Sequence, residues 1–517
     1  MRRVRARITR RRAQAIVRME SPSSPPAAAP RSRRSRVASL SRLAPFGAAL
    51  VVLGLAWLGR GYTADDAFIP GRYALRVVAG DGYTFRDGPP TDGVTGPALL
   101  AIEIGAARLG LDPVDTSKGI GALAVALAAF LVVRRVRARA SGALGSMVSV
   151  IAFACSGALA MHAQSGLETG LATCVLTLAG LGATTRSRAG WALDARVIAA
   201  LLLVPWLRPE LVPVTWALAT VDARRRSREA SAPAIALAVT AAAIGLGSVV
   251  AFRLATFGSA IPLSAQAKPT DLGNGLGYAL VSLATLFGLS LVPALNAART
   301  SRDDGALLLA LVVAVVTVIL GGGDWMPGAR LLVPIAPLVI SLSSIGLARF
   351  ARSRPRGWVV IVAGIALFLP QAALTALSIQ QADEVAFSRA HAGHDLRSLL
   401  DREARVVALV DVGFLAYRAR WEPFDLAGVT DPAIGTRAGE HCAKEVTLDD
   451  LLARDVDTVV LHSGTPPRVT NGVIVGMRGH PVEQALASDP RMRELYVVVG
   501  VVRWAPGYHY VILRRRR

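Results

Sequence analysis

Long apolar segments alternate with short basic clusters along most of this chain, and that alternation limits the folds it can adopt. The 517 residues are 53% hydrophobic, with a mean hydropathy of +0.45, which is high for a soluble protein of this size. Apolar segments flanked by arginine are typical of helices that cross a bilayer repeatedly. The short alternating strands of an outer-membrane barrel do not dominate. We therefore predict a mainly α-helical, polytopic membrane protein.

Eleven apolar segments within residues 44–378 are predicted membrane spans. The first, Pro45 to Arg60, has the basic flank and short apolar core of a signal peptide. We interpret it as an uncleaved anchor, because further membrane segments follow and no clear small-x-small cleavage site precedes Tyr62. The other predicted spans are Gly119 to Val133, Gly142 to Met161, Gly166 to Ala183, Ala195 to Leu207, Leu211 to Val221, Pro233 to Leu254, Leu276 to Leu295, Gly305 to Leu320, Leu331 to Leu347 and Trp358 to Leu377.

The segment from Pro97 to Leu111 decides the predicted topology. It is short and contains Glu103 and Arg108, so we predict an amphipathic helix on the membrane surface rather than a span. Every later basic cluster then falls on the side of the arginine-rich N-terminus, which the positive-inside rule makes cytoplasmic. These clusters are Arg134–Arg139, Arg186–Arg188, Arg224–Arg228, Arg299–Arg302 and Arg349–Arg356.

The formal net charge of +22 does not indicate a nucleic-acid-binding protein. Residues 1–43 contain thirteen arginines and one glutamate, and Arg514 to Arg517 end the sequence. The excess charge therefore lies mostly in the tails, whereas nucleic-acid binding needs a basic face on a folded domain. We predict residues 1–43 to be a disordered, basic, cytoplasmic tail close to anionic lipid. The three cysteines predict no structural disulfide.

From residue 379 onward the sequence has the pattern of a water-soluble α/β domain. The span count places this domain, residues 379–517, on the outer side of the inner (plasma) membrane. The predicted elements are a helix over Ala386 to Glu403, buried strands over Arg405 to Asp411 and Asp457 to His462, and an antiparallel pair formed by Tyr496 to Arg503 and Tyr508 to Leu513.

Asp65 and Asp66 are the leading catalytic candidates. They lie in GYTADDAFIPGRY, at the start of a predicted outer loop over residues 61–118. A carboxylate at the bilayer centre costs about 2.5–3.5 kcal/mol, so a pair directly after a span marks the membrane edge. There one aspartate can accept a proton as general base while the other positions it or binds a sugar or a divalent cation. A helix cap is the simpler interpretation of the same pair.

Four cations on the predicted outer face are candidate ligands for a lipid phosphate. Lys268 follows IPLSAQA, Arg330 follows GGGDWMPGA, Arg208 lies in LRPE and Arg72 lies in the first loop. Arginine binds phosphate in a bidentate manner and lysine binds it as a point charge. Snorkelling of a long basic side chain to the membrane surface explains any one of them equally simply.

Other residues of these loops are candidate sugar- or acceptor-binding groups. Trp325 offers a flat apolar face and Asp324 is the acid beside it, although an interfacial tryptophan is common in membrane proteins. Glu168 and His162 flank the QSGLE turn, where an acid at a helix N-terminus is also an ordinary structural feature. No metal ligands are predicted, because His391 and His394 have helical spacing without the glutamate of a zincin motif.

In their order along the chain, these motifs resemble a known family. DDAFIPGRYALRVVAGDGYTF is similar to the first outer loop of bacterial GT-C membrane glycosyltransferases. Together with SGLET, RPE, a P-x-x-x-x-x-K loop, GGDWMPG-R and a late D-x-G…Y…D-L-x-G, it resembles the terminal β-(1→2)-arabinofuranosyltransferases of actinobacterial cell walls and their uncharacterised relatives. The resemblance covers about residues 44–465. The segments Asp92 to Pro97 and Pro262 to Ser264 depart from the family pattern.

The resemblance implies a GT-C fold and an inverting transfer of one sugar from a polyprenyl-phosphate donor to a cell-envelope glycan on the outer face. The catalytic aspartate of the family falls on Asp65 or Asp66. The two departures leave the sugar open, with a pentofuranose among the options. The alternatives are a lipid-linked sugar flippase and an inactive scaffold of the same fold. Transporters usually place charge at the bilayer midplane and often contain inverted repeats, and this sequence shows neither.

Overall fold

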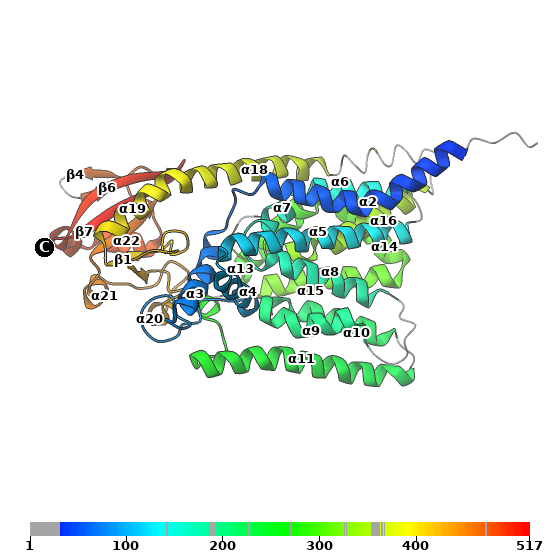
Figure 1. Ribbon diagram of the computed structural model, residues 1–517, viewed down its shortest axis with the longest axis horizontal. Helices are drawn as coiled ribbons and strands as arrows, with labels where there is room; N and C mark the ends of the chain where they lie inside the picture. Colours follow the sequence, from blue (N-terminus) through cyan, green and yellow to red (C-terminus); the bar gives the residue numbers. More distant parts are fainter. Residues whose placement is uncertain are drawn as a thin grey trace, which may run out of the picture.

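The computed structural model describes residues 31–516 except 141–142, 186–192, 226–227, 269, 325, 327, 353–361, 363–365, 367 and 471–472. A bundle of long helices occupies most of the molecule, and a small α/β domain lies at one end of it (Figure 1). The chain passes from the bundle to this domain through one long helix, α18 (Leu369–Ser388). The predicted division into a helical membrane part and a C-terminal α/β part is confirmed.

The helices of the bundle are those expected from the apolar segments, and several have the length of a membrane span. Five stretches are long and apolar enough to cross a membrane, and the number rises to seven if each of two bent helix pairs is one span. The bundle helices are α2 (Arg31–Leu58), α5 (Pro113–Arg139), α6 (Ala143–Ala154), α7 (Gly157–Ala163), α8 (Thr169–Ala183), α9 (Ala195–Leu207), α10 (Val212–Arg224), α11 (Arg228–Phe257), α13 (Leu272–Leu286), α14 (Leu291–Thr300), α15 (Arg302–Leu320) and α16 (Ala336–Arg352).

Two predicted spans are not single straight helices. The segment Gly142 to Met161 forms α6 and α7, bent by 62°, and Leu276 to Leu295 forms α13 and α14, bent by 84°. The second bend follows from Gly288, which has a φ of +47° that few residues other than glycine adopt. Length and composition therefore give fewer certain spans than the eleven predicted. Of the predicted span Trp358 to Leu377, residues 358–361, 363–365 and 367 lie outside the described residues, and its second half forms the start of α18.

The core of the bundle consists mainly of alanine, valine and leucine, with glycines where helix backbones meet. A Cβ on Gly170 of α8 would lie 2.8 Å from the Cα of Gly121 in α5, and a Cβ on Gly245 of α11 would lie 2.3 Å from the Leu201 carbonyl oxygen in α9. Small residues of this kind allow close helix packing where no hydrophobic effect drives helices together.

The basic clusters join helix ends at the end of the bundle remote from the α/β domain. Arg139 of α5 and Arg225, just after α10, both pair with Asp303 of α15. Arg349 of α16 pairs with Asp304 at 3.1 Å. Among the described residues, members of three predicted clusters thus share one end of the bundle, while Arg186–Arg188 lie outside the described residues. Helix α2 already begins at Arg31, inside the stretch predicted to be a disordered tail, and residues 1–30 of that stretch lie outside the described residues.

The segment after α2 folds into short helices that separate the bundle from the α/β domain (Figure 1). They are η1 (Asp65–Ala67), α3 (Phe68–Ala79) and α4 (Pro97–Arg108). Helix α4 has 12 residues, and its rise of about 18 Å falls short of the roughly 30 Å hydrocarbon core. The short length expected of this helix is observed, and its place on the membrane surface stays a prediction. Glu103 of α4 is fully buried and accepts a hydrogen bond from Ser117 of α5.

The α/β domain is built on a five-stranded sheet with the order β2-β1-β3-β7-β6. Strand β1 pairs in parallel with β2 and β3, while β7 is antiparallel to both β3 and β6. The predicted helix, both buried strands and the antiparallel pair are confirmed. Strand β2 was not predicted, because acidic residues and proline are uncommon in strands and β2 is a short edge strand. The elements are η5 (Arg389–Gly393), α19 (His394–Glu403), β1 (Val406–Leu409), β2 (Glu422–Asp425), α20 (Pro432–Gly435), α21 (Leu448–Ala453), β3 (Thr458–Ser463), β4 (Arg468–Thr470), β5 (Val473–Val475), α22 (Pro481–Ser488), α23 (Pro490–Leu495), β6 (Tyr496–Ala505) and β7 (Tyr508–Arg515).

Candidate active site

Asp66, Arg330 and Asp324 meet where the bundle faces the α/β domain. The Asp66 Oδ2 atom lies 4.0 Å from Nη1 of Arg330, too far for a direct hydrogen bond. On its other side, Nε of Arg330 donates a 2.7 Å hydrogen bond to Oδ2 of Asp324. The Asp66 side chain is 32% exposed, whereas that of Asp324 is only 4% exposed. Asp324 therefore fixes the guanidinium, and Asp66 leaves a carboxylate open beside it.

The glycine-rich loop before Arg330 supplies the backbone geometry for this arrangement. Gly322, Gly323 and Gly328 all have φ values near +80°, a conformation that costs little only for glycine. A Cβ on Gly322 would come within 2.8 Å of the Asp271 amide nitrogen. These angles let the backbone turn tightly on both sides of Asp324. Trp325 lies outside the described residues.

The charges of this cluster support one another. Burial by itself would raise the pKa of Asp324, but the nearby charges of Arg330 and Lys268 hold that pKa below its ordinary value. Burial opposes the charge on Arg330, yet Asp324 and Asp66 together raise the pKa of its guanidinium. The Asp324–Arg330 pair therefore stays ionised, and one positive charge remains directed toward Asp66.

Arg208 holds the backbone next to the cluster. Its guanidinium is buried, and it contacts Glu210 at 2.7 Å and Glu168 at 3.6 Å. The Nη1 atom also donates to Oγ1 of Thr169 at 3.2 Å and to the carbonyl oxygen of Arg330 at 3.3 Å. With these partners Arg208 links the QSGLE turn, the LRPE turn and the Arg330 loop. Its contacts position Arg330.

His162 and Lys268 complete the surroundings. His162 of α7 is 1% exposed, and its two ring nitrogens have no hydrogen-bond partner within the described part of the chain. Its Nε2 atom would lie 2.9 Å from a Cβ on Gly328, so the imidazole packs directly under the Arg330 loop. Lys268 follows α12 (Leu263–Gln266) and is half-buried.

Asp65 is directed away from this cluster and toward the α/β domain. Its two carboxylate oxygens accept 3.0 Å hydrogen bonds from the backbone amides of Gly413 and Phe414, and Arg389 lies 3.6 Å away. Burial raises the pKa of Asp65 to about 6, although the charge of Arg389 opposes this rise. Asp65 thus connects the first loop to the turn after β1.

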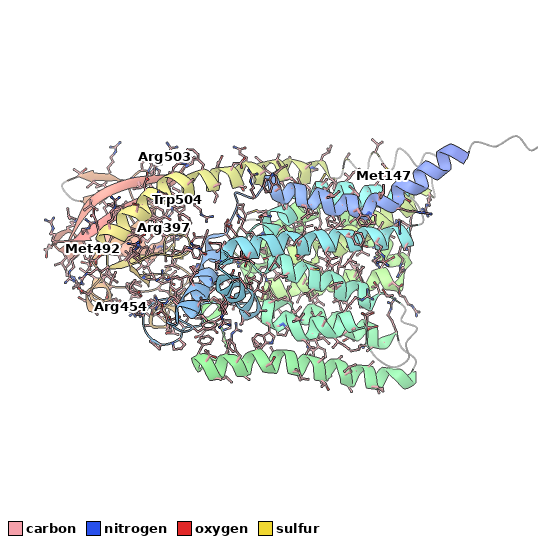
Figure 2. All side chains as sticks on the ribbon, in the orientation of Figure 1. Met147, Arg397, Arg454, Met492, Arg503 and Trp504 are labelled. Atoms are coloured by element: carbon pink, nitrogen blue, oxygen red, sulfur yellow. The ribbon has the colours of Figure 1, made fainter. Side chains whose placement is uncertain are left out.

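Aromatic and basic side chains surround this connection. The Arg389 guanidinium lies over the rings of Phe68 and Phe414, at 4.9 and 5.3 Å, and donates to the Thr63 carbonyl oxygen. Arg397 and Trp504 also pack on Phe414, and both are labelled within the α/β domain in Figure 2. Phe414 is therefore enclosed by groups from both parts of the molecule.

Arg72 lies apart from the Asp66 cluster. Its guanidinium is buried and donates to the backbone carbonyl oxygens of Phe85 and Ala416. These contacts hold α3 against the α/β domain. The position of Arg72 thus indicates a structural role in place of the phosphate contact predicted from the sequence.

The sequence did not predict the direct contact of the α/β domain with Asp65. A Cβ on Gly413 would lie 2.1 Å from the Asp65 carbonyl oxygen, so this position requires a glycine. The Asp411–Gly413 turn, directly after a predicted strand, is the signal in the sequence that points to this contact. Arg389 carried no distinguishing sequence feature, since it is one arginine in a helix.

Comparison with solved structures identifies the architecture. ArnT from Cupriavidus metallidurans bound to undecaprenyl phosphate is similar to this chain, with a TM-score of 0.51 and 14% sequence identity over 93% of this chain and 98% of ArnT. The chain has the GT-C fold. ArnT in the apo state matches with a TM-score of 0.54 and 14% identity, over 92% of this chain and 98% of ArnT.

Sequence comparisons are less informative than the fold. Residues 380–512 match the model of a domain family of unknown function, DUF8728. That match covers the α/β domain and no part of the helical bundle. Among curated proteins, no sequence matches this chain.

Proposed function

We propose that this protein is an inner-membrane glycosyltransferase that moves one sugar from a polyprenyl-phosphate donor to a cell-envelope glycan, with inversion at the anomeric carbon. The observation that carries the proposal is the open Asp66 carboxylate 4.0 Å from an arginine that Asp324 holds in place. The GT-C fold and the undecaprenyl phosphate bound to ArnT support a lipid-phosphate donor. The donor sugar, which can be a pentofuranose, and the acceptor are further parts of the proposal.

Asp66 is the proposed general base. In a single displacement, the acceptor hydroxyl oxygen forms a bond to the anomeric carbon while the bond from that carbon to the phosphate oxygen breaks. The hydroxyl proton passes to Asp66, and the leaving group departs as polyprenyl phosphate. A positioned base of this kind contributes about 10²–10⁴-fold to a rate.

Arg330 is the proposed ligand of the departing phosphate, with Lys268 nearby. Its hydrogen bond to Asp324 fixes the guanidinium before the donor arrives, and charge positioned in advance stabilises a developing anion most effectively. Glu168, His162 and Trp325 are proposed to contact the sugar or the acceptor. Arg208 acts through the backbone of Arg330.

Asp65 has a different proposed role from that of its neighbour. Both of its oxygens already accept hydrogen bonds from Gly413 and Phe414. It therefore holds the α/β domain over the site and positions Asp66, which is adjacent in the chain. In the proposed orientation this domain lies outside the membrane and contributes to acceptor binding, while the N-terminus is cytoplasmic.

The test compares two substitutions in membranes supplied with radiolabelled polyprenyl-phosphate pentofuranose or hexose donors. Asp66→Asn is expected to lower transfer by about 10²–10⁴-fold, and Asp65→Asn to lower it less while weakening domain docking. Asp115→Asn, at an exposed position of α5 in the same loop region, is the matched control and should retain activity. Full transfer by Asp66→Asn would refute the assignment. Movement of labelled lipid across proteoliposomes without a new glycosidic bond would instead favour a flippase.

A further inference from the structure

A second cluster of chemically competent side chains lies in the α/β domain, away from the Asp66 site. His462 is near the end of β3, and His480 and Glu483 lie at the start of α22. One potential ligand atom from each of the three residues lies within 4.8 Å of the other two. Sequence patterns do not indicate this grouping, because seventeen residues including the β4–β5 hairpin separate the two histidines.

The backbone already fixes the carboxylate of this cluster. Oε1 of Glu483 accepts a 2.6 Å hydrogen bond from the His462 amide, and Oε2 accepts one of 2.8 Å from the His480 amide. Gly479 permits the close approach, since a Cβ there would lie 2.4 Å from the His462 carbonyl oxygen. Both histidines thus hold the carboxylate through their main chains while their imidazoles lie beside it.

The cluster contains a buried carboxyl group that pairs with no arginine or lysine in the described part of the chain. The Glu483 side chain is 1% exposed, and in the described part of the chain its ion-pair contact is with the His462 ring, at 4.0 Å. Both ring nitrogens of His462 are buried and have no hydrogen-bond partner among the described residues. A buried carboxylate and an unpartnered imidazole both carry a desolvation cost, and a bound cation would offset the two costs together.

We propose that His462, His480 and Glu483 bind one divalent transition-metal ion, with Zn²⁺ as the favoured species. Two imidazoles and a carboxylate suit zinc, whereas Ca²⁺ and Mg²⁺ prefer sites made of oxygen ligands. Tetrahedral zinc with bonds of about 2.0–2.2 Å places its ligand atoms roughly 3.3–3.5 Å apart. The 4.0 Å separation of His462 Nδ1 from Glu483 Oε2 therefore needs only a small movement of the side chains.

Metal binding changes one existing contact. The His480 side chain now accepts a hydrogen bond from the Glu483 amide as the N-cap of α22, and on loading this lone pair turns to the metal. The remaining contacts favour binding, because amides that hold a ligating carboxylate reduce the cost of ordering it. The fourth position is left to water. The ion would join the end of β3 to the start of α22 and stabilise the domain independently of the proposed transfer reaction.

The test uses the full-length protein in detergent with any polyhistidine tag removed, stripped with EDTA and then titrated with Zn²⁺ or Co²⁺. The expected result is one equivalent of bound metal, a higher melting temperature, and visible Co²⁺ absorption of a four-coordinate site. His480→Ser keeps a side chain that can cap α22 but removes the imidazole, so the fold is retained and affinity is expected to fall at least ~10-fold. His462→Phe keeps a ring against Tyr508, which lies 4.0 Å from the His462 ring, and should lose binding as well.

The control removes two histidines outside the cluster. The double variant His391→Ala with His394→Ala deletes a pair with helical spacing and should bind Zn²⁺ as the unmodified protein does. Equal zinc affinity in the unmodified protein and in His480→Ser and His462→Phe would overturn the proposal. So would the absence of any zinc binding by the unmodified protein. Glycosyl transfer is not needed as a readout, so the result is separate from the proposed function.

Discussion

The two ends of the helical bundle both contain arginine–carboxylate pairs. The pairs differ in the distance between arginine and carboxylate and in how exposed the carboxylate is. At the end remote from the α/β domain, Asp304 is fully buried between Arg135 at 3.0 Å and Arg349 at 3.1 Å. At the other end, Asp66 is 32% exposed and Arg330 stays 4.0 Å away. The remote pairs resemble structural ion pairs that fix helix ends, whereas the Asp66 end holds an ion pair with room between its members.

The distance and exposure of these ion pairs distinguish structural pairs from catalytic ones better than the types of residue do. A buried pair gives little net stability, yet removing one partner is costly because the other charge stays uncompensated. A carboxylate that is held near a cation without contacting it can still accept a proton or a ligand. We therefore predict that substitutions near Asp66 lower the rate of transfer, whereas substitutions at the remote end lower stability.

After Asp66→Asn, the largest expected effect is on transfer, at Arg330. Arg330→Gln should lower the transfer rate by about 10²–10³-fold, because a donor directed at a developing anion is lost. Arg330→Lys keeps the charge but not the planar guanidinium that reaches Asp324. Its transfer rate should therefore lie between that of Arg330→Gln and that of the unmodified protein. Radiolabelled transfer normalised to folded protein measures both. At the remote end, Arg349→Gln is the control, and an equal loss of transfer there would remove the distinction between the ends.

A large effect on stability is expected at Asp304. Asp304→Asn leaves Arg135 and Arg349 near a buried position without an anion, at a cost of about 3–5 kcal/mol. The melting temperature in detergent should fall, while transfer per folded molecule stays unchanged. Asp303→Asn is the milder comparison, since Asp303 is 21% exposed. A normal melting temperature for Asp304→Asn would show that the remote pairs are not structural.

A moderate effect is expected where the α/β domain joins the Asp66 end. Gly413→Ala places a Cβ 2.1 Å from the Asp65 carbonyl oxygen and should destabilise domain docking by about 1–3 kcal/mol, as overpacking does. Proteolysis between the two parts and the transfer rate measure the outcome. Gly500→Ala in β6 is the matched control, because the nearest atom lies 4.0 Å from its Cβ. Identical behaviour of the two variants would argue against the Asp65 contact.

The smallest effect is a change of stability with pH at Asp65. Folding raises the pKa of this carboxyl from 3.8 to about 6, so the folded protein binds the proton more tightly than the unfolded chain. The resulting stabilisation is present below the unfolded pKa and is lost as pH rises through about 6. The Asp65→Asn variant has no titrating carboxyl at this position, so its stability does not fall in this way as pH rises. The melting temperature of the variant, relative to the unmodified protein, should therefore increase between about pH 4.5 and pH 7, and a constant difference would contradict the shift.

Local patterns were sufficient to predict a helical membrane part and a C-terminal α/β domain, because each apolar segment and most of the strands carry their own signal. The sequence was sufficient to predict that Arg330, Asp324 and Asp66 lie near one another, because the basic clusters placed their loops on the same face of the membrane. The separate functions of Asp65 and Asp66 could not be predicted, since they depend on Gly413 and Phe414, about 350 residues later in the chain. The bend at Gly288 was also missed, because a positive φ within an apolar segment leaves no mark on hydropathy.

Helix α18 continues into α19 through the five-residue π segment Arg389–Gly393, and this has a consequence for insertions and deletions. A π turn contains one residue more than an α turn. The wider turn absorbs this extra residue, so α19 continues close to the register that a regular α18 would set. Deleting Ala390 would close the π turn to an α turn, whereas deleting one residue of α18 itself would rotate all that follows by about 100° around the helix axis. Arg389 and the Gly413–Phe414 amides would then no longer meet Asp65 together, so the connection to the C-terminal domain tolerates a one-residue deletion in the π segment and not in α18.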